Sequence, residues 1–90
     1  MFWVPRWERE ALNELTALWV GSDSAQRRSI TAATHSVDEG LRRDPWSLSE
    51  SRASGRRVQF FPPLLVTFRI EADERTVSVL HVRLFRPLAS

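Results

Sequence analysis

Three consecutive β-strands predicted in residues 56 to 86 constrain the fold of this chain most. Apolar and polar residues alternate from Arg57 to Phe61 and from Leu65 to Glu71, the spacing of strands that cover a core on one side. The run from Thr76 to Phe85 is apolar at successive positions, which is typical of a central strand buried on both faces. Polar residues 72 to 75 predict a hairpin turn between the last two runs. We therefore expect a three-stranded antiparallel meander.

Two α-helices are predicted before this meander. Apolar residues between Ala11 and Trp19 recur at i, i+1, i+4, i+7 and i+8, and Gly21 ends that helix. Asp23 and Gln26 have the spacing of a helix-capping box, and Asp44-Pro45 ends the second helix. The short loop between the two predicts an antiparallel helical hairpin.

The chain begins with a β-prone run from Phe2 to Val4, closed by Pro5, which suits an edge strand. The order of elements is then β-α-α-β-β-β. Ninety residues are too few for two separate cores. We expect a single α+β domain over residues 1–90, with the helical hairpin packed on one face of a small antiparallel sheet.

Composition excludes several classes of protein. The chain has no cysteine, which excludes disulfides and thiolate metal sites. His35 has no second ligand at a suitable spacing, so neither a metal nor another cofactor is expected. No apolar run is long enough for a membrane helix, and no signal peptide is recognisable, so a cytoplasmic protein without membrane contact is expected.

All thirteen basic side chains are arginines. Arginine binds phosphate and carboxylate in a bidentate manner and stacks on nucleic-acid bases. A GC-rich coding sequence would also enrich arginine, and composition alone does not separate these two explanations.

Strand alternation predicts one covered and one polar face of the sheet. The helices are expected to cover the face formed by Val58, Phe60, Val66, Phe68, Ile70, Leu80, Val82 and Leu84. The other face would then carry Arg57, Gln59, Thr67, Arg69, Glu71, His81 and Arg83, with Arg56 and Arg86 at its rim.

This polar face is the candidate site. Guanidinium groups can bind a phosphate backbone and stabilise charge at a phosphoryl group, and an imidazole can act as acid or base. Arg57, His81 and Arg83 are the predicted catalytic residues, and the predicted nucleic-acid-binding residues are Arg56, Gln59, Arg69 and Arg86. The alternative is a face that is polar only because water covers it.

Two of the four tryptophans are candidate partner-binding residues. Trp3 and Trp46 lie in short or irregular segments and could anchor another protein. Alternatively, all four tryptophans pack inside this small domain.

The ordered set of motifs resembles the RelE/ParE toxin superfamily. A short first strand is followed by W-x-x-x-A-L-x-E-L, which begins at Trp7, and the second helix ends in D-E-x-L-R-R-D-P from Asp38 to Pro45. The segment from Phe68 to Arg83, F-R-I-E-A-D-E-R-T-V-S-V-L-H-V-R, is similar to the last strands of that family. The resemblance covers essentially the whole chain. It implies a bacterial toxin of a type II toxin–antitoxin system, bound by a cognate antitoxin in a hetero-oligomer.

The family divides by target, and the resemblance leaves the target open. RelE-like members are ribosome-dependent mRNA interferases that use basic residues on the sheet, often with a C-terminal tyrosine, whereas ParE-like members inhibit DNA gyrase. Arg57 and Arg83 lie where the ribonucleases carry basic residues, but Leu65 stands in place of a common arginine and the chain has no tyrosine. Three functions therefore remain: an mRNA interferase that causes growth arrest, a gyrase inhibitor, and a non-catalytic binding module.

Overall fold

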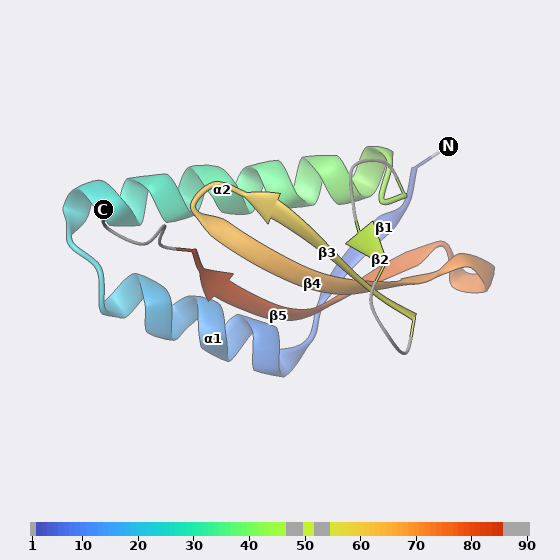
Figure 1. Cartoon of the computed structure of the whole chain (residues 1–90), viewed down its shortest axis with the longest axis horizontal. Helices are drawn as coiled ribbons and strands as arrows, with labels where there is room; N and C mark the ends of the chain where they lie inside the picture. Colours follow the sequence, from blue (N-terminus) through green and yellow to red (C-terminus); the bar gives the residue numbers. More distant parts are fainter. Residues whose placement is uncertain (1, 47–49, 52–54, 86–90) are drawn as a thin grey trace.

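The computed structural model describes residues 2–46, 50–51 and 55–85. They form two helices and one five-stranded sheet with the order β1-β5-β4-β3-β2 (Figure 1). The elements are β1 (Val4–Trp7), α1 (Arg9–Val20), α2 (Ser24–Arg43), β2 (Glu50–Ser51), β3 (Arg56–Phe61), β4 (Leu64–Glu71), the short 3-10 helix η2 (Ala72–Glu74) and β5 (Thr76–Leu84). The predicted α+β class and the helices packed on a sheet are confirmed. No helix of the described residues is long and apolar enough to cross a membrane.

The sheet is mixed, whereas the sequence predicted an antiparallel one. Strands β2 to β5 pair antiparallel with their neighbours, but β1 runs parallel to β5. The first strand also lies later than expected, because Pro5 falls inside β1 and pairs with Val77. Proline is tolerated there because β1 is an edge strand with a neighbour on one side only. The short strand β2 was not predicted.

The two helices begin and end close to the predicted residues. The backbone N–H of Gln26 donates to the Asp23 carboxylate at 2.8 Å, which caps α2. Arg42 and Arg43 lie in the last turn of α2, where the helix dipole favours positive charge. Helix α2 runs along one face of the sheet, and α1 lies beside β5 (Figure 1).

The hydrophobic core lies between the helices and this face of the sheet. Ala11 of α1 is fully buried, whereas the predicted core residues Leu12 and Trp19 are 47% and 42% exposed. Helix α1 therefore packs through a narrower stripe than its apolar pattern predicted. The buried apolar core consists of Ala11, Ile30, Ala33, Val37, Leu41, Phe61, Leu64, Val66, Phe68, Val77, Val79 and Val82.

A β-bulge explains the apolar pattern of β5. Thr67 pairs with His81 but the next residue, Phe68, pairs with Val79, so Leu80 is an extra residue in β5. The bulge shifts the alternation by one position. Val79 and Val82 are consequently both buried, although residues three positions apart would point to opposite faces of a regular strand. Strand β5 is an inner strand, as predicted, lying between β1 and β4.

Candidate functional site

The sheet has an open face, which is the face that α2 does not cover. Directly paired residues of neighbouring strands point to the same side of a sheet. Pairs of buried residues, such as Val66 with Val82, mark the covered face. The intervening pairs therefore belong to the open face, which carries Arg56, Val58, Phe60, Leu65, Thr67, Arg69, Glu71, Thr76, Ser78, His81 and Arg83.

The predicted orientation of β3 is wrong. Gln59 pairs with Val66 and Arg57 pairs with Phe68, so both polar residues belong to the covered face. The reason lies at Phe61, which is 8% exposed and packs under α2. Its ring lies so close to Gly40 that a Cβ on this glycine would be 3.1 Å from the Cε1 atom of Phe61. Because Phe61 is buried, Phe60 must point to the open face.

Arg57 is separated from the other predicted catalytic residues by this orientation. Its Nη2 atom donates to the backbone oxygen of Trp46 at 3.4 Å, and its guanidinium carbon lies 5.2 Å from the centre of the Trp46 ring. Arg57 thus contacts Trp46, which lies three residues after the end of α2. Trp46 itself is 51% exposed, while Trp3 packs against the core with Arg75 over its ring at 5.2 Å. The partner-binding role of both tryptophans stays a prediction.

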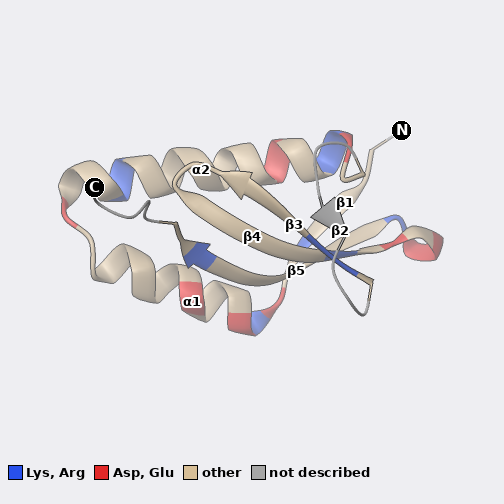
Figure 2. Cartoon of the chain, viewed as in Figure 1, with Lys and Arg blue, Asp and Glu red and all other residues tan. Residues whose placement is uncertain are grey.

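Two arginines lie directly opposite each other at one end of the open face. Arg56 of β3 pairs with Arg69 of β4, and both side chains are exposed. Like charges in direct cross-strand positions repel each other and destabilise a sheet by roughly 0.2–1 kcal/mol. A bound anion would offset this repulsion. Figure 2 shows the basic start of β3, which pairs with β4 at this end of the sheet.

The other end of the open face is aromatic. The rings of Phe60 and Phe85 meet edge to face, with their centroids 5.0 Å apart and their planes at 64°. They are 47% and 46% exposed. The backbone N–H of Phe85 donates to the oxygen of Pro63 at 2.8 Å, which holds Phe85 beside the start of β4. Leu65, which pairs with the exposed Arg83, lies next to Phe60 across β3 and β4.

This aromatic pair was missed in the sequence because Phe60 was assigned to the core. The only signal was the double phenylalanine at positions 60 and 61, where one residue must point to each face. The alternation of the strand alone does not determine which of the two is buried.

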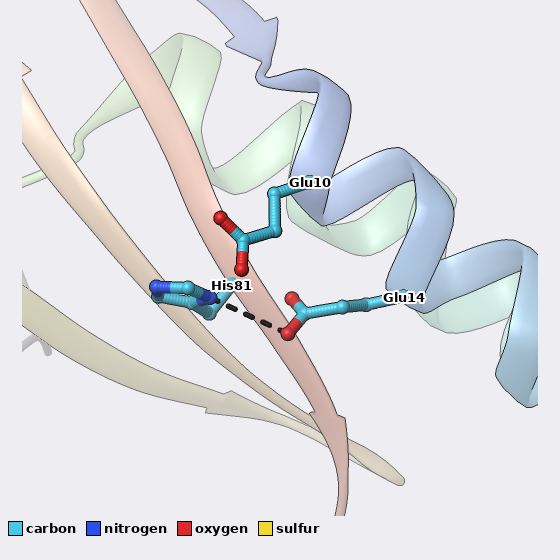
Figure 3. Close-up of side chains that lie close together, drawn as sticks. All are labelled: Glu10, Glu14 and His81. Atoms are coloured by element: carbon cyan, nitrogen blue, oxygen red, sulfur yellow. Dashed lines mark hydrogen bonds and ion pairs between the residues drawn. The ribbon is translucent and has the colours of Figure 1, made fainter.

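His81 lies at the edge of the open face, beside α1. Its Nδ1 atom is 3.4 Å from Oε2 of Glu14, and Oε1 of Glu14 accepts a hydrogen bond from the backbone N–H of Val82 at 3.0 Å. Glu10 of α1 extends towards the same point (Figure 3). Neither glutamate was predicted as a site residue, because α1 and β5 are far apart in sequence.

The structure thus brings together only part of the predicted site. Arg56, Arg69, His81 and Arg83 share the open face, whereas Arg57 and Gln59 belong to the covered face. Arg86 lies outside the described residues. The catalytic and binding roles of these residues remain predictions.

Neither a protein-family model nor a curated protein matches the chain. Solved structures do. A chain of the RelBE2 toxin–antitoxin complex from Mycobacterium tuberculosis matches with a TM-score of 0.76 at 18% identity, over 93% of this chain and 92% of that one. A chain of the chromosomal ParDE system from P. aeruginosa matches with a TM-score of 0.73 at 15% identity, over 93% and 97%. The chain has a RelE/ParE-like fold.

The isolated E. coli RelE toxin is a more distant match to this RelE/ParE-like fold. Its TM-score is 0.56 at 14% identity, over 94% of this chain and 86% of that one. The resemblance recognised in the sequence is therefore confirmed at the level of the fold. RelBE and ParDE structures are both among the neighbours, so the fold does not distinguish a RelE-like from a ParE-like chain.

Proposed function

We propose that this chain is the toxin component of a bacterial toxin–antitoxin pair and that its open face contacts mRNA. The toxin assignment is supported by the RelE/ParE-like fold over 93% of the chain. The solved relatives include toxin–antitoxin complexes, which supports a cognate antitoxin as the partner. The toxin would act in the cytoplasm and be released when the antitoxin is lost.

The opposed pair of Arg56 and Arg69 carries the RNA part of the proposal. Two exposed guanidinium groups in direct cross-strand positions lower their mutual repulsion when an anion lies between them. RNA supplies such an anion at every phosphate. The exposed rings of Phe60 and Phe85 add surfaces on which unpaired bases can stack. Guanidinium groups at one end of a face and exposed aromatic rings at the other can bind the phosphates and the bases of single-stranded RNA.

Cleavage would take place near Arg83 and His81. Both belong to the open face of β5, two residues apart, which corresponds to roughly 7 Å along a strand. Arg83 would stabilise negative charge on the reacting phosphate, and His81 would transfer a proton. The Glu14 carboxylate orients the imidazole of His81 by its contact with Nδ1.

Expression in a bacterium that lacks the antitoxin tests this function. We expect growth arrest, together with new mRNA 5′ ends that accumulate within coding regions and disappear when ribosomes are removed from the message. Co-expression of the protein encoded by the neighbouring gene should restore growth if that protein is the antitoxin. Normal growth with abundant folded protein, and unchanged mRNA ends, would contradict the proposal.

Gyrase inhibition is the second candidate, favoured by the apolar, aromatic end of the open face. Phe60, Leu65 and Phe85 form a surface suited to docking another protein, while Arg57 is turned away from it. A supercoiling assay with purified gyrase decides between the two functions. Inhibition of gyrase, with DNA breaks and intact mRNA in cells, would replace the mRNA-directed function by the gyrase-directed one.

A further inference from the structure

Three side chains converge where α1 meets β5, and one of them, His81, is also the proposed proton-transfer group. Glu10 and Glu14 lie one helical turn apart, so their carboxylates share one side of α1. His81 reaches the same point from β5 (Figure 3). One ligand atom from each of the three residues lies within 4.8 Å of the other two.

Glu14 is held in a fixed orientation. One oxygen of its carboxylate accepts the backbone N–H of Val82, and the other lies 3.4 Å from Nδ1 of His81. Pairing between β1 and β5 ends at Trp7 and Val79, so the N–H of Val82 lies past the end of β1. The Glu14 carboxylate accepts the hydrogen bond that a neighbouring strand would otherwise accept from this N–H. Hydrogen bonds of this kind fix the direction of metal-binding carboxylates and imidazoles.

The cluster has an excess of negative charge. Glutamates at i and i+4 on a helix repel each other. Within the described residues, neither Glu10 nor Glu14 forms an ion pair with an arginine, and the contact between Glu14 and His81 is an ion pair only when the imidazole is protonated. That contact explains the positions of two side chains. It does not explain why the third carboxylate, from Glu10, approaches the same point.

A divalent cation would satisfy all three groups. Carboxylate oxygens together with an imidazole nitrogen form a mixed set of ligands that suits Zn²⁺ and similar transition ions, whereas Mg²⁺ and Ca²⁺ favour oxygen ligands. Three protein ligands would leave a coordination position for water. An ion can enter from solvent, since Glu10 is exposed and the side chains of Glu14 and His81 are each 30% exposed.

We propose that Glu10, Glu14 and His81 bind a divalent transition-metal ion of the Zn²⁺ class. The ion would join α1 to β5 at the edge of the open face. Its charge would lie next to the surface that carries Arg83 and Thr67. The site shares His81 and Glu14 with the proposed cleavage site, but metal binding can be tested by itself because it depends only on the geometry of the three side chains.

Calorimetric titration of the metal-stripped, full-length chain with ZnCl₂ tests this site. We expect a single saturable site for Zn²⁺ and at least ~10-fold weaker binding of MgCl₂. Glu10→Gln and His81→Asn should each weaken Zn²⁺ binding by at least ~10-fold. Glu10 is exposed, so Glu10→Gln removes a ligand without disturbing the core. Saturating Zn²⁺ should also raise the melting temperature of the wild type but not of Glu10→Gln.

Matched controls replace the same residue types outside the cluster. Glu39→Gln and His35→Asn, both on exposed positions of α2, should leave Zn²⁺ binding unchanged. Loss of binding in His35→Asn but not in His81→Asn would overturn the proposal, as would the absence of saturable binding to the folded wild type. Binding that survives in Glu10→Gln would show that Glu10 is not a ligand and would overturn the three-residue site. None of these results depends on whether the chain arrests growth.

Discussion

The two faces of the sheet differ in how they are built. On the covered face, Val66, Phe68 and Val82 are almost fully buried in one continuous core. On the open face, Phe60 is almost half exposed and two arginines face each other across β3 and β4. The covered face therefore lowers the free energy of the fold, whereas the open face retains apolar exposure and charge repulsion. A face that costs stability in two ways is the one expected to bind a ligand.

Replacing a buried residue of β4 should give the largest effect. Phe68→Ala removes a ring with no exposed surface and should lower the free energy of unfolding by about 3–5 kcal/mol. Thr67→Ala, the adjacent residue on the open face, should lower it by about 1 kcal/mol or less. Urea unfolding followed by tryptophan fluorescence measures both. Equal losses in the two variants would remove the distinction between the faces.

The neighbouring phenylalanines of β3 should separate binding from stability. Phe60→Ala should weaken binding of a short single-stranded RNA by about 1–3 kcal/mol, because a stacked base loses its aromatic partner. Its effect on the free energy of unfolding should be smaller than that of Phe61→Ala, since Phe60 is 47% exposed and Phe61 only 8%. Fluorescence anisotropy gives the affinity and urea unfolding the stability. An unchanged affinity in Phe60→Ala would exclude stacking on this residue.

Ser78 belongs to the open face by its pairing but is buried like a residue of the covered face. Its pairing with Arg69 assigns it to the open side, yet it is 2% exposed and its hydroxyl has no hydrogen-bond partner among the described residues. Ser78→Ala should raise the free energy of unfolding by about 1 kcal/mol, because a buried unsatisfied hydroxyl is removed. A lower free energy of unfolding would mean that the hydroxyl is satisfied in solution.

The smallest effect is expected at the opposed arginines. Arg56→Ala should raise the free energy of unfolding by roughly 0.2–1 kcal/mol, because the repulsion with Arg69 is removed. It should also weaken RNA binding and reduce its dependence on salt concentration, with a slope smaller by about 0.7 for one lost phosphate contact. Anisotropy titrations at several salt concentrations measure this slope. A more stable variant with unchanged RNA affinity would assign the arginine pair no role in binding.

Most of the fold could be predicted from the sequence, because its signals are local. Asp23 and Gln26 are three residues apart, and the apolar periods of α1 and β4 each lie within one element. The parallel pairing of β1 with β5 could not be predicted, since the paired segments are separated by most of the chain. Long-range pairing leaves little trace in a short edge strand that contains Pro5.

The candidate site could be predicted only in part, because its residues depend on strand orientation. Arg69, His81 and Arg83 were assigned to the correct face, but Arg57 and Gln59 were not. The orientation of β3 depends on which of two adjacent phenylalanines fits against Gly40 of α2. That is a property of packing between distant elements. The cluster of Glu10, Glu14 and His81 was missed for the same reason.

Growth arrest by matched charge-reversal variants tests the central claim that the open face is the working surface. Arg83→Glu changes an exposed residue of that face, and Arg28→Glu makes the same change on an exposed position of α2. Both variants should fold with unchanged circular dichroism. We predict that expression of Arg28→Glu arrests growth like the wild type, whereas Arg83→Glu permits growth. Equal arrest by both variants at equal protein levels would contradict the account.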